Sequence, residues 1–304
     1  MAVAYRLEGI SISNRDNEEF SLISKLKLSL PIIDSVGLNT QIISSQSLTK
    51  WFQSLDKLIK YSLSKLIFDL LDKKINEQLT EIFFKKTLIN PKENKYPKQI
   101  ILLVEHILFS LILEKQIKKK TKLFIRNMKF KIEDQLNTSI TEQKKQENCL
   151  IIQRLYFRDI LSKLIEIEND LTLNSYEWLS LIKYEIDQNS RIENKIHFLQ
   201  FSNRILYNFE FIEASSTFII SPMMERTLFE LTQAISAYRI GVVHAPSQYG
   251  KSAVIQTLAQ LCGTNCINVF CNSSTNVNQI ENFHQGLVAS NSWCLFKNIQ
   301  QLSI

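Results

Sequence analysis

Apolar residues recur every three or four positions along several long stretches of the chain. In SLTKWFQSLDKLIKYSLSKLIFDLL (47–71) they form one stripe, and most of the lysines fall outside it. This spacing predicts an amphipathic helix. Similar spacing predicts helices over 96–117, where Pro97 suits a first helical turn, over 149–168 and over 175–186. We therefore expect residues 1–208 to be mostly α-helical.

The pattern changes at about residue 209. Short apolar runs at 217–221, 240–245, 267–271 and 293–296 alternate with helix-like segments at 225–238, 251–261 and 276–288. Gly263 is a plausible stop for the second of these helices. Strands that alternate with helices predict parallel pairing. The expected fold is thus a helical N-terminal two-thirds (1–208) followed by an incomplete α/β P-loop domain (209–304), which stops before such a domain could close.

Composition narrows the class of protein. The 304 residues are 45% hydrophobic and 22% charged, which is typical of a globular protein with a buried core. The net charge of +6 gives a weak preference for acidic partners. The segment Lys115–Lys131 is the most basic, and we interpret it as a solvated helix face, with contact to an acidic surface as the alternative. Its two aromatic residues, Phe124 and Phe130, do not form interleaving of the kind used to stack on bases, so nucleic acid is not an expected partner.

Other function classes receive little support. No apolar run has the length of a membrane span or a secretory signal, so a membrane is not an expected partner either. The five cysteines form no CxxC pair, which argues against a zinc site. His244 and His284 are interpreted as structural or surface residues, and Cys294 as a small apolar filler.

The stretch GVVHAPSQYGKS (241–252) has the order of a phosphate-binding loop. In such loops a strand ends, backbone N–H groups turn inward, and a helix begins with its positive end towards the phosphates. A lysine then reaches the terminal phosphates and a hydroxyl binds Mg²⁺. Lys251 and Ser252 occupy those two positions. The candidate loop residues are Ala245, Pro246, Ser247, Gln248, Tyr249 and Gly250.

Two residues depart from the usual loop. Ala245 stands in place of the first glycine, and Gln248 stands where a second glycine is common. If position 248 requires positive φ, its side chain costs on the order of 1–2 kcal/mol. The alternative interpretation is a lysine at an unrelated strand–helix turn. The predicted strand before the loop and helix after it favour the nucleotide site.

Ordered segments of the chain resemble the heavy chain of dynein, of the axonemal type. The resemblance extends from the rear of the linker into the first AAA+ module. The segments that carry it are LTKWFQSLDKLIKYSL, YPKQIILLVEHILFS, LYFRDILSKLI, SYEWLSLIKYEID, YNFEFIEASSTFIISPMMERTLFELTQAI, HAPSQYGKSAVIQTLAQLCGTNCINVFCNSS and IENFHQGLVASNSWCLFKNIQQLSI.

The resemblance implies a linker-like helical region and part of an AAA+ domain that binds ATP and Mg²⁺. It places Ile220 and Pro222 beside the adenine and Ser252 on the metal. It also implies dynein intermediate and light chains and microtubules as partners, and a place in the cytoplasm and cytoskeleton, with the axoneme of a cilium expected. The chain would then be a segment or short isoform of a motor.

One departure from the family concerns catalysis. The family's strand CFDEF ends in an aspartate that supports Mg²⁺ and a glutamate that polarises the attacking water. Lys297 and Asn298 occupy those positions here. A cation repels Mg²⁺ and asparagine cannot act as a base, so this module is expected not to hydrolyse ATP at a useful rate. The alternative is a non-catalytic helical scaffold or interaction protein with a vestigial AAA+ remnant. A P-loop kinase is poorly supported.

Overall fold

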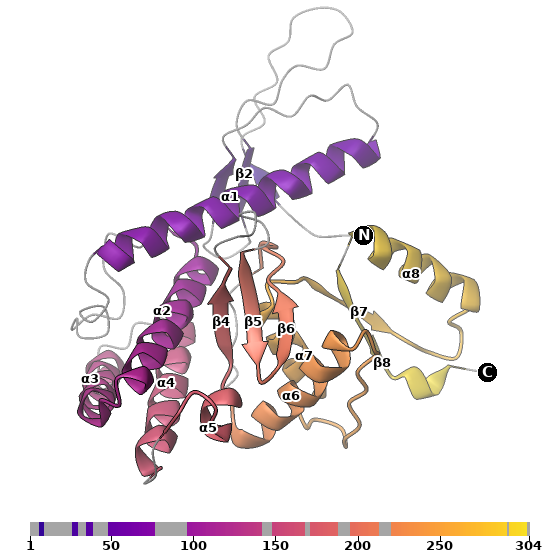
Figure 1. Ribbon diagram of the computed structural model, residues 1–304. Coiled ribbons are helices and arrows are strands. Elements are labelled where there is room, and N and C mark those ends of the chain that lie inside the picture. Colours follow the sequence, from indigo (N-terminus) through magenta and orange to yellow (C-terminus); the bar gives the residue numbers. More distant parts are fainter. Residues whose placement is uncertain are drawn as a thin grey trace, which may run out of the picture.

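The computed structural model describes ten ranges of the chain, and Figure 1 shows their arrangement. These ranges are 6–8, 26–29, 35–38, 48–76, 96–141, 148–167, 171–187, 195–212, 220–290 and 292–302. Long helices pack beside a central antiparallel sheet, and a smaller α/β segment follows on the other side of that sheet. Within the described ranges, no helix has the length and apolar character that crossing a bilayer requires.

Among the described residues, four long helices build the first part of the molecule, and the apolar spacing over 47–71, 96–117 and 149–168 predicts three of them. They are α1 (Leu48–Asn76), α2 (Lys98–Lys118), α3 (Lys122–Thr141) and α4 (Asn148–Glu166). The second helix is buried over most of its circumference because α1, α3 and strand β4 (Lys183–Ile186) pack around it. Pro97 is the N-cap residue of α2 and so stands just before the first turn.

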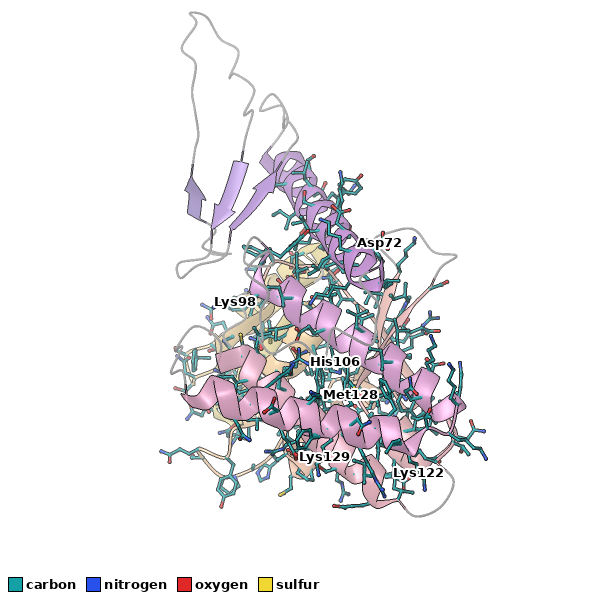
Figure 2. The ribbon with its side chains drawn as sticks, turned by 90° about the vertical axis from the view of Figure 1, so that its left-hand side faces the viewer. Asp72, Lys98, His106, Lys122, Met128 and Lys129 are labelled. Carbon is teal, nitrogen blue, oxygen red and sulfur yellow. The ribbon has the colours of Figure 1, made fainter. Side chains whose placement is uncertain are left out.

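The basic segment Lys115–Lys131 spans the end of α2, a short turn and the first half of α3. Lys119, Arg126 and Lys131 are exposed. Lys122 and Lys129 lie along α3, the helix nearest the viewer in Figure 2. The buried side chains of this segment, such as Met128, face the neighbouring helices. This arrangement agrees with a solvated helix face.

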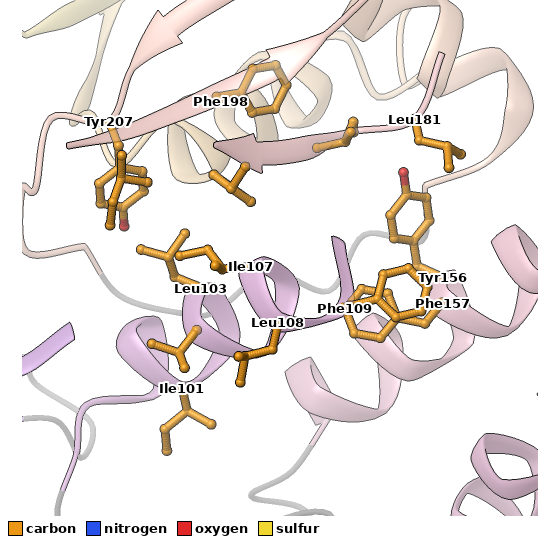
Figure 3. Packing of buried hydrophobic residues seen from close by; sticks show 14 of the residues in the cluster. Ile101, Leu103, Ile107, Leu108, Phe109, Tyr156, Phe157, Leu181, Phe198 and Tyr207 are labelled. Carbon is orange, nitrogen blue, oxygen red and sulfur yellow. The ribbon is translucent and has the colours of Figure 1, made fainter. Parts of the chain in front are cut away.

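Aromatic side chains join the helices to one another and to the sheet. The rings of Phe109 and Phe157 stack with their centroids 3.9 Å apart, which fixes α2 against α4 (Figure 3). The His106 ring packs edge-on against Phe157 and Tyr184, and its Nε2 lies 3.1 Å from the Ile182 carbonyl oxygen. Burial lowers the pKa of His106 to about 4, so the ring is neutral at pH 7. Its role is structural, as expected for the histidines of this chain.

Among the described residues, two antiparallel sheets lie within the region expected to be helical. The first consists of β1 (Arg6–Glu8), β2 (Leu26–Ser29) and β3 (Ser35–Leu38). The second consists of β4, β5 (Ile196–Gln200) and β6 (Asn203–Leu206). The prediction of one helix over 175–186 is therefore wrong in its second half, since α5 covers only Tyr176–Leu179. In Lys183–Ile186 the buried Tyr184 alternates with more exposed neighbours, which is strand periodicity.

The C-terminal third confirms the predicted alternation in part. Its helices are α6 (Pro222–Ser236), α7 (Lys251–Leu261) and α8 (Val277–Ser290), and a short 3₁₀ turn, η5, covers Ile299–Gln301. Strands β7 (Cys266–Phe270) and β8 (Trp293–Lys297) pair in parallel, as the crossover pattern predicts. Of the apolar run at 217–221, residues 217–219 lie outside the described ranges, and the remaining two residues are not in a strand.

The strand predicted at 240–245 does not form. In the described part of the chain, this segment runs from α6 to α7 without pairing to a strand. Ile240 and Val242 are 89% and 82% exposed. An extended segment becomes a strand only when a neighbour takes up its backbone hydrogen bonds, and β7 is paired with β8 instead. The prediction of a strand at 240–245 is therefore wrong, although the apolar composition of the run is typical of a strand.

Replacing Gly263 by alanine is expected to lower the free energy of unfolding by about 2–4 kcal/mol. Gly263 ends α7 with φ of 61°, and a Cβ there would lie 2.4 Å from the Tyr207 ring. Urea denaturation of the variant measures the loss. Gly286→Ala is the matched control, because a Cβ on that glycine in α8 meets nothing within 4 Å. The control is expected to be neutral or slightly stabilising, and equal effects of the two changes would contradict this account.

Candidate nucleotide-binding site

The loop before α7 contains two residues with left-handed backbone conformation. Gly250 is the N-cap residue of α7 and has φ of 74°, in the left-handed region that favours glycine. Gln248 also has positive φ, at 66°. This is the position at which the sequence predicts strain from a side chain. The strain is on the order of 1–2 kcal/mol and leaves the loop compact.

The Lys251 side chain folds back onto the loop. Its ammonium donates hydrogen bonds to the carbonyl oxygens of Ala245 and of Pro246, the latter at 2.8 Å. The loop backbone therefore curves around a positive charge. Tyr249 is 74% exposed and does not fill the loop, and Ser247 and Gln248 are also exposed. Ser252 lies in the first turn of α7, next to the helix N-terminus that favours anions.

Ile220 and Pro222 lie at the start of α6. Ser221 caps this helix by accepting a hydrogen bond from the Met224 N–H at 3.3 Å, and Pro222 is its first residue. Ile220 lines a cavity together with Thr257 and Leu261 of α7. Since Thr257 is six residues after Lys251, about 9 Å along the helix axis, Ile220 packs beside the later turns of α7 and away from the loop. The structure brings the loop residues together with Lys251 and Ser252, and places Ile220 apart from them.

The end of β8 carries no acid. Lys297 is the last residue of that strand, and Asn298 follows with φ of 58°. The Lys297 ammonium lies 5.0 Å from the centroid of the Phe270 ring, at the end of the paired strand. Residues 293–302 contain neither aspartate nor glutamate. A water molecule activated at this strand end would therefore lack a carboxylate base from it.

The groups at the candidate loop suit a polyphosphate better than a metal ion that is bound by protein side chains alone. Mg²⁺ in nucleotide sites takes its ligands from phosphate oxygens, waters, a hydroxyl and one or two carboxylates. Ser252 would be the source of the hydroxyl, while β8 has no carboxylate to offer. No group of three metal-binding side chains gathers anywhere in the described ranges. Mg²⁺ would therefore enter with the nucleotide.

The C-terminal part of the chain matches a known family. Residues 207–304 match the family described as the hydrolytic ATP binding site of the dynein motor region. The resemblance to dynein heavy chains is confirmed. Human dynein axonemal heavy chain 2 is 24% identical over 156 residues, which is 51% of this chain, and human dynein axonemal heavy chain 10 is 25% identical over 194 residues, or 62%.

A cytoplasmic dynein heavy chain is also similar. That of Neurospora crassa is 22% identical over 284 residues, which is 88% of this chain. The chain spans 3%, 4% and 6% of the lengths of these three relatives. Because axonemal and cytoplasmic relatives both match, the similarity is to dynein heavy chains in general, and the axonemal subtype stays a prediction.

Glu210 lies at a junction that the sequence patterns do not predict. Its carboxylate accepts hydrogen bonds from the Asn265 N–H at 2.6 Å and the Asn208 side chain at 2.7 Å. Lys60 of α1 lies 3.9 Å from the same carboxylate. The Glu210 N–H donates to the Gly263 carbonyl oxygen at 2.9 Å. The carboxylate thus ties the helical region to the turn between α7 and β7.

Gln99 of α2 completes this junction. Its side-chain amide donates to the Glu210 carbonyl oxygen at 2.7 Å and to the Tyr207 hydroxyl at 3.0 Å, and it accepts from the Ile212 N–H at 3.0 Å. The segment 207–212 is therefore bonded to α2 on one side and to the end of α7 on the other. This arrangement fixes the helix that begins with Lys251. The one available signal was an acid within the apolar stretch NFEFI.

Stability is expected to fall with rising pH because of Glu210. Burial raises the pKa of its carboxyl to about 7, while the Asn265 N–H and Lys60 oppose the shift. Since the unfolded pKa is near 4.3, this protonation stabilises the folded state below about pH 4 and is lost as pH rises through 7. We expect Glu210 to remove about 1 kcal/mol of unfolding free energy between pH 6.5 and 8.5.

The measurement compares urea unfolding of the parent chain and Glu210→Gln at both pH values. The variant removes this titration alone, so the shifted pKa values of other groups, including His106, cancel in the difference. Parallel pH profiles for the two proteins would contradict the assignment.

Proposed function

We propose that this dynein-like chain binds ATP with Mg²⁺ through the loop Ala245–Gly250, and that it does not hydrolyse the nucleotide. The observation that carries the proposal is the closed loop around the Lys251 ammonium, with a left-handed Gly250 directly before α7. Phosphate oxygens would replace the two loop carbonyls as acceptors for Lys251. Hydrogen bonds to phosphate join two ionised groups, whereas the present ones join the ammonium to neutral carbonyl oxygens, and this difference favours the exchange.

The absence of turnover rests on the end of β8. Phosphoryl transfer depends on positioned charge, and the positions that resemble those of the two catalytic acids hold Lys297 and Asn298. The Lys297 ammonium packs over Phe270. The site therefore holds the nucleotide's phosphates but offers no base from this strand. ATP would serve as a ligand that stabilises the α7 region.

Calorimetric titration with Mg·ATP, together with an assay of phosphate release, tests both halves of the proposal. We expect binding of one nucleotide per chain and turnover below about 10⁻³ s⁻¹, the order of an unassisted P-loop NTPase. Failure to bind at millimolar Mg·ATP would contradict the first half. Turnover well above that rate would contradict the second.

A second candidate is a helical scaffold whose AAA+ part no longer binds nucleotide. It is favoured by the hydrogen bonds of Lys251 to its own loop, which satisfy the ammonium without any phosphate. Thermal unfolding distinguishes the two, because a ligand that binds only the folded state raises the melting temperature in proportion to RT ln(1 + [L]/Kd). An unchanged melting temperature in millimolar Mg·ATP favours the scaffold.

The similarity to dynein heavy chains supports a wider proposal about the partners and the location of this chain. We extend the proposal to a linker-like role for 1–208, to microtubules and dynein intermediate and light chains as partners, and to the cytoskeleton, with the ciliary axoneme as the specific place. Its support is the similarity to dynein heavy chains, axonemal ones included. Co-sedimentation of the chain with dynein subunits from isolated axonemes tests the partners, and recovery only in the unbound fraction would contradict them.

A further inference from the structure

A groove of about 580 Å³ lies between α1, α2 and the β4–β5 hairpin, on a different part of the molecule from the phosphate loop. Its apolar walls come from Phe68 of α1, Leu111 of α2, Trp178 of α5 and Leu199 of β5. Figure 2 shows Asp72 at the end of α1 that passes next to α2, and this residue forms part of the rim. Grooves of this size and lining accommodate small organic molecules.

Lys183 of β4 lines this groove and has an unusual set of contacts. Its ammonium donates a hydrogen bond to the Trp178 carbonyl oxygen at 2.8 Å and lies 4.6 Å from the centroid of the Trp178 ring. Among the described residues it forms no ion pair. The nearby acids are engaged elsewhere: Glu114 pairs with Lys118 at 2.6 Å, and Glu185 pairs with Arg204 at 3.3 Å.

The remaining charged groups around the groove are Asp72 on α1 and Lys195 before β5. The Lys195 ammonium lies 5.4 Å from the centroid of the Phe68 ring, on the opposite wall. Lys183 thus faces apolar and cationic neighbours together with carboxylates that it does not contact. Burial against the apolar walls of the groove disfavours the charged ammonium, while the Trp178 contacts and the nearby carboxylates favour it. Burial is the larger effect, so the neutral amine, which is the nucleophile, is more accessible than in an exposed lysine.

We propose that Lys183 is a nucleophilic lysine and that this groove is an acylation site for small thioesters with an apolar acyl chain. The neutral amine attacks the thioester carbonyl, the N–C bond forms and the C–S bond breaks. The thiolate leaves and takes up the proton that the nitrogen loses, so the products are an amide and a thiol. The acyl chain lies along Leu111, Trp178 and Leu199.

The acidity of Lys183 agrees with this chemistry. Burial lowers its pKa to about 8, with the charge of Glu114 acting in the opposite sense. At pH 7.5 roughly a quarter of Lys183 is then neutral, against about one part in a thousand for a lysine of ordinary pKa. A less basic amine is intrinsically a weaker nucleophile, so we expect a net rate advantage of about tenfold.

The test uses the whole chain with hexanoyl- and acetyl-N-acetylcysteamine at low conversion, and mass spectrometry measures acylation at each lysine. Exposed Lys119 of the α2–α3 turn is the internal reference. At pH 7.5 we expect Lys183 to react about tenfold faster than Lys119, with a larger ratio for hexanoyl than for acetyl. Its rate should level off above pH 8, while that of Lys119 continues to rise.

Two variants with matched exposure test the groove. Ile75→Glu places a charge at the rim, where Ile75 is 40% exposed, and it should abolish the preference for hexanoyl. Tyr61→Glu, on the same helix but outside the groove, should leave the preference intact; Tyr61 is 49% exposed. A Lys183 rate no higher than that of Lys119 overturns the nucleophilic lysine. Equal ratios for the two acyl chains in the parent protein overturn the acyl-binding groove.

Discussion

Replacing Lys251 by alanine is expected to weaken Mg·ATP binding by about 100-fold. Lys251 is the cation at the proposed phosphate-binding loop, and its ammonium donates hydrogen bonds to the carbonyl oxygens of Ala245 and Pro246. Charged hydrogen bonds contribute roughly 1.5–3 kcal/mol each, and about 2.7 kcal/mol corresponds to a factor of 100 in Kd. Alanine carries no charge and cannot donate a hydrogen bond to the phosphates. It also leaves the loop carbonyls without the donor that Lys251 provides.

Calorimetric titration of the parent chain and the variant measures the loss. Lys57→Ala is the control, because Lys57 is an exposed lysine on α1 and its removal changes net charge equally. The melting temperature of Lys251→Ala without nucleotide must stay close to that of the parent, which separates lost binding from lost folding. Equal affinities for the parent and Lys251→Ala would remove the loop from the site.

The long helices could be predicted because their periodicity matches their burial. In α1, the apolar positions Leu55, Ile59, Leu63 and Ile67 recur at the helical spacing, and all four are buried. The boundaries of α7 were predicted to the residue, since Gly250 and Gly263 flank it with positive φ. Local sequence patterns are enough to predict a helix and its ends when the capping residues and the apolar stripe indicate the same boundaries.

The β4–β6 sheet could not be predicted in the same way. Its strands are only four or five residues long, and short apolar runs are ambiguous between helix and strand. The run at 240–245 failed in the opposite sense, because its composition is that of a strand and no strand pairs with it in the described ranges. In both cases, whether a strand forms depends on pairing with a segment distant in sequence, and local sequence patterns contain no information about that pairing.

In the candidate site, too, the features formed by consecutive residues could be predicted and the long-range contacts could not. Its loop residues follow one another in sequence, so their order alone predicts a phosphate site. The Glu210 junction joins residues 150 and more positions apart, from Lys60 of α1 to Asn265 before β7. Resemblance to a family identified the segment around Glu210 but not the contacts of its carboxylate. Those contacts become visible only once the helical region and α7 are placed together.

Replacing Glu105 by alanine is expected to lower the free energy of unfolding by about 3–5 kcal/mol. Glu105 of α2 and Arg154 of α4 are 1% and 2% exposed, and their charged groups are 3.0 Å apart. Lys74 of α1 lies 4.0 Å from the same carboxylate oxygen. Removing the carboxylate leaves two buried cations facing each other across three packed helices, and desolvated like charges repel strongly.

Urea denaturation of Glu105→Ala measures this loss, with Glu114→Ala as the control on the same helix. Glu114 pairs with Lys118 one turn away at the surface, and such pairs contribute less than about 1 kcal/mol. Glu105→Gln separates charge from shape, because the amide keeps the volume and one acceptor. If the glutamine variant is as unstable as the alanine variant, the carboxylate charge holds α1, α2 and α4 together. A loss below about 1 kcal/mol in Glu105→Ala would instead mean that the two cations are neutralised without Glu105.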